Sequence, residues 1–421
     1  MIKRLLKMVP IVAGVAAAAV VLTAGSSMAA TQTASTLITG SGSDTTYYMM
    51  TGLGDLYNQA PGCNPLATSQ PLDGSCPNSG SENQANFLNY FHDYTVEKFP
   101  IGSSGGINQL CKKGQVGVVA PSFARSSRVP QNAAAGGSDC AGLRFVGYAK
   151  DAITWECFPG GGSNPCAGVS SITQADLKNI FVNCSVTDWS AVGGSSGGID
   201  VYVPQAKSGT GISWAGYLGV TLSASQALDT CIPAAHKSPA VAPGQPGSWV
   251  SPENTNALIH TNGDEANAIF PFSVGVYHFT YGANNFTGSD GSSLGKINGV
   301  QATDPNILSG LFPASRFLFN VYCKGVSTAG VLKCGGSSPA LAQTTKFMGT
   351  VGFLCKNESK FKDTGSNPIL DPITGQPYRS APDGSGNPQG EIPNTISQFG
   401  FVPLKKQGTT STATYCTTFD S

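Results

Sequence analysis

Three segments in the first half of the chain share one order of residues, which constrains the fold more than any other feature. In each, a short apolar stretch leads into a cluster of Gly, Ser and Thr, followed by apolar residues at helical spacing. The clusters are Gly40 to Thr46, Gly102 to Gly106, and Ser208 to Thr210. This order predicts a strand, a tight loop and a helix each time. The alternation of strands and helices favours an α/β fold.

Other stretches add to this pattern. Thr173, three residues before Asp176, predicts a capped helix start. Pro, Gly and Ser at close intervals predict long loops at 238–256 and 367–393. Apolar composition predicts strands at 36–38, 97–101, 116–120, 143–155, 201–203, 273–279, 317–323 and 349–355.

The three Gly/Ser/Thr clusters have a chemical meaning if they open helices. A helix N-terminus presents unpaired N–H groups and the positive end of the helix dipole, so it binds oxyanions without a formal charge. Hydroxyl groups add donors, and glycine lets the backbone approach a ligand closely. Each cluster can equally be a simple helix cap, because Ser, Thr and Asp are the preferred capping residues. The spacing alone does not show whether the three converge.

The first thirty residues predict export. Lys3, Arg4 and Lys7 precede an apolar run from Val9 to Ala24, and small residues follow. We expect a signal peptide over residues 1–30, cleaved near Ala29-Ala30, and a secreted protein of the cell envelope or periplasm. A signal anchor is the alternative.

Cysteine count and charge limit the partners. All twelve Cys lie after the predicted signal peptide, and their even number predicts disulfides, mostly between residues near in sequence.

Cleavage of the signal peptide would remove three of the 24 basic residues and none of the 24 acidic ones, leaving a formal charge of −3. A nucleic-acid partner is therefore not expected. The remaining length of about 390 residues predicts two domains.

Enzyme signatures are weak. Gly102 to Gly106 matches the G-x-S-x-G pattern of hydrolases, but so do residues 193–197 and 194–198. The four His lie in no local catalytic motif, and the sequence contains no Cys-x-x-Cys zinc knuckle. We expect no enzyme, no catalytic residue, no metal and no cofactor. A Ser-His-Asp triad, and with it a secreted phosphoesterase, is the weaker alternative.

The same loops resemble those of a known family. Residues 42–47, 99–107 and 208–210 are similar in order and spacing to the ligand loops of the periplasmic phosphate-binding proteins that serve phosphate ABC transporters. Residues 177–181 and the Trp-containing turn at 188–194 also resemble that family. The resemblance spans roughly residues 36 to 290 and is strongest to its Cys-rich actinobacterial forms.

The resemblance implies a set of site residues and two departures. The family has an Asp after the strand that ends near Ala120, where this chain has Phe123 to Arg128, and an Arg where this chain has Pro204. Arg125 or Lys207 is then the candidate source of positive charge, whereas we favour a solvated surface position for Arg128. The predicted ligand-binding residues are Thr45, Thr46, Tyr47, Ser103, Ser104, Arg125, Ser126, Lys207, Ser208, Gly209 and Thr210.

The resemblance also implies an architecture. We expect a two-lobed periplasmic-binding-protein type II fold with mixed central sheets, closing by a hinge over phosphate or a similar oxyanion. Lobe 1 would comprise residues 31–150 and a return segment, 266–421, that includes a C-terminal extension; lobe 2 would comprise 151–265. The protein would be a monomer with an ABC permease as candidate partner. A secreted binding or adhesion protein that kept the fold and lost transport is the alternative.

Overall fold

The computed structural model describes most of the chain after the predicted signal peptide. The described residues are 40–59, 102–111, 122–131, 139–282, 284–324, 344–363, 365–371, 373–408 and 413–420. The signal peptide and the strands predicted at 36–38, 97–101 and 116–120 lie outside them. Among the described helices, none has the length and apolar character needed to cross a membrane.

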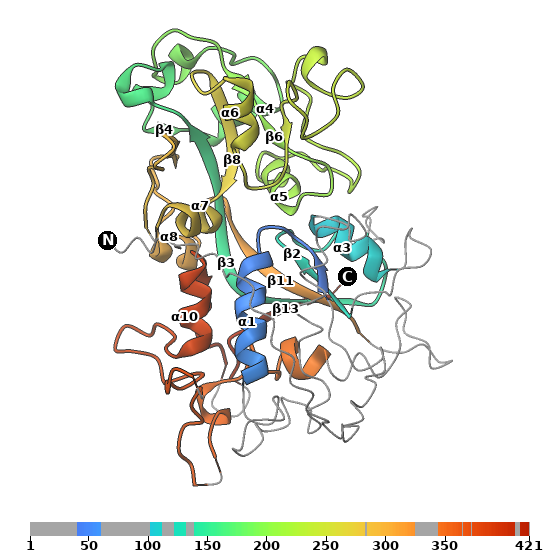
Figure 1. Cartoon of the computed structure of the whole chain (residues 1–421), viewed down its shortest axis with the longest axis vertical. Helices are drawn as coiled ribbons and strands as arrows, with labels where there is room; N and C mark the ends of the chain where they lie inside the picture. Colours follow the sequence, from blue (N-terminus) through green and yellow to red (C-terminus); the bar gives the residue numbers. More distant parts are fainter. Residues whose placement is uncertain are drawn as a thin grey trace, which may run out of the picture. The chain divides into compact units, whose positions relative to one another are not determined.

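Strand β3 (Leu143–Cys157) links two parts of the fold, because its two halves pair with different strands. Its first ten residues run antiparallel to β11 (Ser315–Cys323), and residues 153–156 run antiparallel to β8 (Ala268–Ser273). Figure 1 shows β3 passing from the elements around β11 to those around β8. Nearly all of its side chains are buried, as expected for a strand covered on both faces.

Shorter strands complete a sheet of mixed direction. β1 (Gly40–Gly42) is parallel to β2 (Phe123–Ser126), and β5 (Asp200–Val201) is parallel to β8. The strand order is β1-β2-β11-β3-β8-β5. Also paired with β3 are β9 (Ser293–Leu294), β12 (Val402–Pro403) and β13 (Thr417–Asp420). Separate pairs are β4 (Ser171–Ile172) with β10 (Lys296–Ile297) and β6 (Val203–Pro204) with β7 (Val250–Ser251).

One hydrophobic core lies against the β11 half of β3. Helix α1 (Tyr47–Gln59) buries Met49, Met50 and Leu53 on one face, and α10 (Glu391–Gln398) packs beside it. Residues at this spacing share a helix face, so their burial fixes the orientation of α1. The N-terminus of α1 is thereby directed toward the end of β1.

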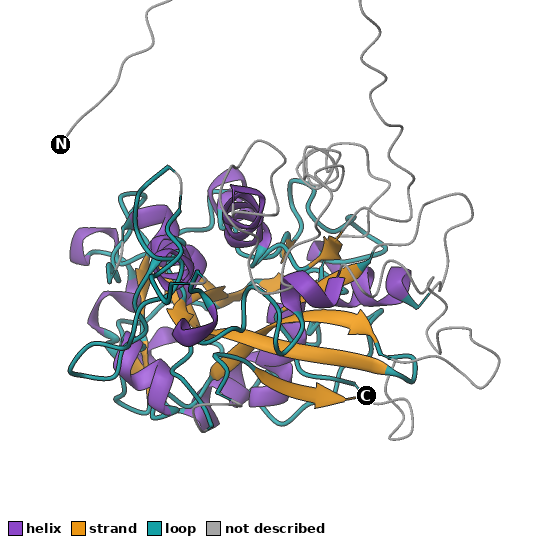
Figure 2. Cartoon of the chain, turned by 90° about the horizontal axis from the view of Figure 1, so that it is seen from below, coloured by secondary structure: helices purple, strands orange, loops and turns teal. Residues whose placement is uncertain are grey.

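A second core lies against the β8 half of β3. It is covered by α4 (Gln174–Phe181), α5 (Gly209–Tyr217) and α6 (Ala257–Asn262). The Trp residues pack in cores, as predicted: Trp155, Trp189 and Trp214 are almost fully buried. Further described helices are α3 (Ser103–Leu110), α7 (Val274–Tyr281), α8 (Asp304–Ser309) and a short helix at 344–348. Short 3-10 turns occur at Gly160–Gly162, Pro165–Gly168, Trp189–Val192, Ala234–His236 and Glu358–Lys360. Figure 2 shows helices around the strands and long loops between them.

The sequence-based elements are confirmed at several points and wrong at two. The strands at 143–155 and 317–323 and the capped helix at Thr173 are present. The strand predicted at 273–279 is instead α7, because the Ser273 hydroxyl accepts the Val276 N–H at 3.2 Å and caps a helix. The strand predicted at 349–355 is a series of turns, in which a Cβ on Gly352 would lie 2.4 Å from the Thr345 carbonyl oxygen.

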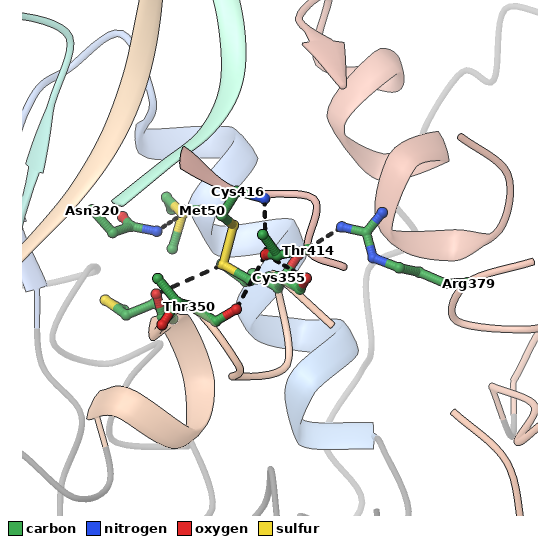
Figure 3. The surroundings of a disulfide bond; sticks show 9 residues. Met50, Asn320, Thr350, Cys355, Arg379, Thr414 and Cys416 are labelled. Carbon is green, nitrogen blue, oxygen red and sulfur yellow. Dashed lines mark hydrogen bonds between the residues drawn. A yellow bond between two sulfur atoms is a disulfide. The ribbon is translucent and has the colours of Figure 1, made fainter. Parts of the chain in front are cut away.

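Four disulfides join described cysteines: Cys111–Cys140, Cys157–Cys166, Cys184–Cys231 and Cys355–Cys416. The prediction of disulfides is confirmed. Two of these four close sequence separations of 9 and 29 residues and two close separations of 47 and 61, so the prediction that most bridges join residues near in sequence stays a prediction. Figure 3 shows the longest one: the Thr414 hydroxyl donates to the Cys355 carbonyl oxygen at 3.0 Å, beside the disulfide.

Candidate functional site

The first Gly/Ser/Thr loop joins β1 to α1 and is held by Arg125. The Arg125 Nε donates to the Ser43 carbonyl oxygen at 3.0 Å, and its Nη2 donates to the Gly42 carbonyl oxygen at 3.2 Å. The guanidinium also lies over the Tyr47 ring. Gly42 has a φ of 116°, and a Cβ there would lie 2.4 Å from the Arg125 carbonyl oxygen. Glycine therefore permits the close contact between β1 and β2 at this point.

The second loop reaches the third through the N-terminus of α3. Gly102 has a φ of 76°, and a Cβ there would lie 2.5 Å from the Lys207 carbonyl oxygen. The Ser104 N–H donates to that same oxygen at 3.1 Å. A Cβ on Gly106 would lie 2.5 Å from Gly42 Cα, so α3 also touches the first loop.

The third loop opens α5 and completes the convergence. The Ser208 hydroxyl caps the helix by accepting the Gly211 N–H at 2.9 Å. A Cβ on Gly209 would lie 2.1 Å from Ser103 Oγ and 2.3 Å from Ser127 Oγ. The three loops therefore meet, and Figure 1 shows α1, α3 and α5 approaching one another.

Five buried hydroxyl groups gather where the loops meet, and we call them the hydroxyl cluster. The Ser127 hydroxyl is central: it lies 3.0 Å from Ser43 Oγ, 3.3 Å from Ser103 Oγ and 3.4 Å from Thr45 Oγ1. Thr45 Oγ1 lies 3.3 Å from Thr210 Oγ1. The members of the cluster are Ser43, Thr45, Ser103, Ser127 and Thr210.

The carboxylate of Glu253 sits among these hydroxyls. Its Oε1 accepts from Thr45 Oγ1 at 2.8 Å, Ser127 Oγ at 3.3 Å, and both the hydroxyl and the N–H of Thr210 at 2.7 and 3.0 Å. Its Oε2 is buried and has no hydrogen-bond partner among the described residues. Glu253 itself is 5% exposed. One anionic oxygen thus receives four donors at the start of α5, where the helix dipole also favours negative charge.

Arg316 and Asp151 support the cluster from the central strands. Arg316 Nη2 donates to Asp151 Oδ2 at 2.7 Å and to Thr210 Oγ1 at 3.1 Å, while its Nη1 donates to the Ser127 carbonyl oxygen at 3.1 Å. Asp151 also accepts from the Ser273 hydroxyl and the Gly275 N–H at the N-terminus of α7. Both charged groups are therefore buried with several partners.

These contacts set the direction of the hydroxyl hydrogens. Arg316 can only donate, so Thr210 Oγ1 accepts from it and turns its own hydrogen toward Glu253. The side-chain Oδ1 of Asn254 accepts the Ser273 N–H. Its side-chain Nδ2 therefore donates to Thr45 Oγ1, at 2.7 Å. Thr45 must then donate to Glu253. The cluster is arranged to present donors to an acceptor-only anion.

Nearby titratable groups add little positive charge to the cluster. Burial lowers the pKa of His278 on α7, although the charge of Asp151 acts in the opposite direction. His278 is therefore neutral at pH 7. Among the described residues, the guanidinium of Arg316 donates to a hydroxyl of the cluster, and that of Arg125 donates to the backbone of Ser43.

The structure brings together some of the predicted site residues and separates others. Thr45, Ser103 and Thr210 belong to the hydroxyl cluster, and Ser208 and Gly209 shape the third loop. The backbone of Lys207 contacts α3 while its side chain is exposed. The predicted residues whose side chains lie elsewhere are Thr46, beside Tyr148; Tyr47, under Arg125; Ser104, bonded to Arg128; Ser126, bonded to the Arg128 backbone; and Arg125, on the first loop.

The solvated position favoured for Arg128 is wrong. Its side chain is buried and forms an ion pair with Asp139, and its Nε donates to Ser104 Oγ at 2.9 Å. A buried Arg is stable only when its donors are paired, and here a carboxylate, a hydroxyl and the Val129 carbonyl oxygen pair them.

Five residues of the site are absent from the predicted ligand-binding residues: Ser43, Ser127, Asp151, Glu253 and Arg316. Two of them carried a signal in the sequence. Glu253 is the single charged residue in the loop 238–256, and Arg316 is the single charged residue of strand β11. Their convergence comes from pairing between distant strands, which the sequence pattern does not reveal.

Together, these features define a mixed α/β fold with a polar centre lined by helix N-termini. The profile of the PBP superfamily domain matches residues 66–339, more than half of the chain, so the chain belongs to the PBP superfamily. The predicted fold class is confirmed.

Several solved structures are similar to this chain. An ABC-type phosphate transport receptor from Vibrio cholerae is 19% identical, with a TM-score of 0.41 over 69% of this chain and 89% of that one. A phosphate-binding protein from Stenotrophomonas maltophilia is 13% identical, with a TM-score of 0.47 over 88% of this chain and 91% of that one. No curated protein matches the chain.

Proposed function

We propose that this protein is an exported solute-binding protein that holds phosphate or a similar oxyanion in the hydroxyl cluster. The observation that carries the proposal is the set of four donors, from Thr45, Ser127 and Thr210, that converge on one anionic oxygen of Glu253. A phosphate oxygen has the same charge and the same acceptor chemistry as that carboxylate oxygen. The structural relatives named as phosphate-binding proteins are consistent with this choice of anion.

Arg316 is the proposed source of positive charge at the site. The resemblance led us to expect an Arg four residues before Ser208, where this chain has Pro204. Arg316 instead reaches the third loop from β11 and contacts Thr210. Its pairing with Asp151 keeps it in place and lowers the net positive charge near the anion.

The ligand would lie between the two proposed lobes. We propose lobe 1 as residues 31–150 and 266–421, and lobe 2 as residues 151–265. Two hydrophobic cores support this division. The core against the β8 half of β3 is built mostly from residues within 151–265, and the core against the β11 half is built from residues outside that range. Thr45 and Ser127 would come from lobe 1, and Thr210 and Glu253 from lobe 2. Binding would then close the lobes by a hinge near residue 151.

Secretion and transport complete the proposal. Residues 1–30 would be a signal peptide cleaved near Ala29-Ala30, and the four disulfides fit an oxidising compartment. The mature protein would act as a monomer that delivers its ligand to an ABC permease.

One observation favours a second candidate function, a secreted binding protein that has lost transport. Glu253 already occupies the hydroxyl cluster, so the chain satisfies these donors itself. In that case the site would be structural, and no oxyanion would bind.

Calorimetric titration of the mature, ligand-free protein with phosphate, sulfate and arsenate separates these functions. Saturable heat with phosphate supports the proposal, and no heat with any of the three rejects it. Thr210→Val removes a donor but keeps the side-chain shape, and we expect it to weaken binding at least about tenfold, the cost of a charge-assisted hydrogen bond. The matched control is Thr280→Val on α7, whose exposed hydroxyl bonds only within its helix.

A further inference from the structure

The loop that carries Glu253 is built to hold its carboxylate in the hydroxyl cluster. Glu253 follows β7, where the Ser251 hydroxyl donates to the Thr255 carbonyl oxygen at 3.1 Å and closes the turn. Asn254 has a positive φ of 57°, a conformation that Asn tolerates better than most residues. Its side chain bonds both Thr45 and Ser273. Glu253 and Asn254 thus bond the first loop, the third loop and the end of β8.

The carboxylate and an oxyanion would need the same donors. Oε1 of Glu253 already receives the hydroxyls of Thr45, Ser127 and Thr210 and the Thr210 N–H. Each hydroxyl has one hydrogen, so it cannot serve a second anion while Glu253 stays in place. Two buried anions at this distance would also repel each other, and the local positive charge of Arg316 is already shared with Asp151.

The second carboxylate oxygen of Glu253 lowers the free energy needed to displace this carboxylate from the hydroxyl cluster. Oε2 is buried and lacks a hydrogen-bond partner in the described structure, which carries a desolvation penalty. A ligand with four oxygens could use the same donors through one oxygen and place the others toward Arg316 and the remaining hydroxyls. The carboxylate therefore fits the cluster less completely than a tetrahedral anion would.

We propose that Glu253 is an internal competitor: its carboxylate occupies the anion position in the free protein, and the bound oxyanion must displace it. This inference rests on the proposed function. It assigns to Glu253 the role of setting the affinity for the oxyanion, so that weakly bound anions do not displace its carboxylate. If Glu253 occupies the site for about 99% of the time, the measured affinity is reduced about 100-fold relative to a protein without it.

A different role for Glu253 predicts the opposite effect of its removal. If the carboxylate remained in the site and accepted the proton of a hydrogen phosphate ion, it would contribute to binding. Replacing it would then weaken the complex, whereas removing a competitor strengthens it.

The test compares phosphate titrations of the mature protein and three variants. Glu253→Ala removes the carboxylate, and Glu253→Gln keeps its shape without its charge, which guards against a folding defect in the first variant. Glu265→Ala is the matched control, because it removes a half-exposed carboxylate that pairs with His260. Circular dichroism and thermal unfolding establish that each variant is folded before titration.

We expect both Glu253 variants to bind phosphate at least about tenfold more tightly than the unmodified protein, with Glu265→Ala unchanged. Binding by the Glu253 variants alone, with none by the unmodified protein, would support displacement of the Glu253 carboxylate but would reject phosphate binding as the function of the unmodified protein. If the unmodified protein binds phosphate and the Glu253 variants bind equally or more weakly, the competitor role is rejected while the proposed function stands. If none of the proteins binds phosphate, sulfate or arsenate, the proposed function fails, and the competitor role fails with it.

Discussion

Arg316 and Asp151 form a buried ion pair in which Nη2 donates to Oδ2 at 2.7 Å, joining β11 to β3 directly beside the hydroxyl cluster. The same guanidinium donates to Thr210, and the same carboxylate accepts hydrogen bonds from the Ser273 hydroxyl and the Gly275 N–H at the N-terminus of α7. This pair therefore fixes both the direction of the Thr210 hydroxyl and the position of the strand on which the two cores meet.

Asp151→Asn should destabilise the protein strongly, because it leaves Arg316 buried without its counter-charge. Breaking a buried ion pair from one side costs about 3–5 kcal/mol. The matched control is Asp420→Asn, which breaks the exposed pairs with Arg144 and Lys324 and should cost less than about 1 kcal/mol. Urea denaturation of both variants measures the difference. Equal losses of unfolding free energy would show that the Arg316–Asp151 pair is not a main support of the fold.

Gly209→Ala should damage the site through packing alone. The new Cβ would lie 2.1 Å from Ser103 Oγ and 2.3 Å from Ser127 Oγ, so the loops must separate. We expect a loss of about 1–3 kcal/mol of unfolding free energy and weaker phosphate binding. Gly216→Ala, later in α5, has no atom within 4 Å of the added Cβ and should stabilise the helix by up to about 1 kcal/mol. Similar stability for the two variants would contradict the close contact at Gly209.

Removing the Cys355–Cys416 disulfide should cost more stability than removing Cys157–Cys166. The first closes a sequence separation of 61 residues and the second one of 9. Loop-closure entropy then predicts losses of about 4 and about 2.5 kcal/mol for the paired Cys→Ala variants. Guanidinium denaturation under identical conditions compares them. A larger loss from the shorter loop would mean that native packing, rather than chain entropy, dominates.

Stability should fall as the pH rises from about 4.5 to about 8 because of Glu156. Burial raises the pKa of this carboxyl to about 8, against 4.5 for the free group, while a hydrogen bond from Asn256 acts in the opposite direction. In this window the folded protein holds a proton that the unfolded chain releases, so raising the pH favours unfolding. The slope is up to about 1.4 kcal/mol per pH unit.

Glu156→Gln should remove this part of the pH dependence and leave the variant more stable than the unmodified protein at pH 8. Denaturation midpoints measured between pH 5 and pH 8 provide the comparison. Parallel profiles for the two proteins would show that Glu156 does not hold a proton in the folded state.

The sequence predicted the local parts of the site better than their arrangement. Gly and Ser at 102–106 and 208–210 identified the starts of α3 and α5, because glycine and capping residues act within a few positions of themselves. The same local rules failed at 273–279, where apolar residues with no clear period form a helix that Ser273 caps.

Glu253, Arg316 and Asp151 lay beyond such rules. Arg316 and Asp151 meet because β11 pairs with β3, and Glu253 follows β7, which pairs with β6; these long-range registers are contained in no local pattern. Arg125 lies beside a predicted loop and was expected to contact the ligand. In the structure its guanidinium donates to the backbone carbonyl oxygens of Gly42 and Ser43, a role that sequence proximity does not reveal.

The location of a bound oxyanion tests the central claim most directly. A crystal of the mature protein grown with arsenate would give an anomalous arsenic signal at the ligand position. The account predicts that signal among Thr45, Ser127 and Thr210, with the Glu253 carboxylate moved out of hydrogen-bonding distance of Thr210. An arsenic site elsewhere, or none while Glu253 keeps its place, would contradict it.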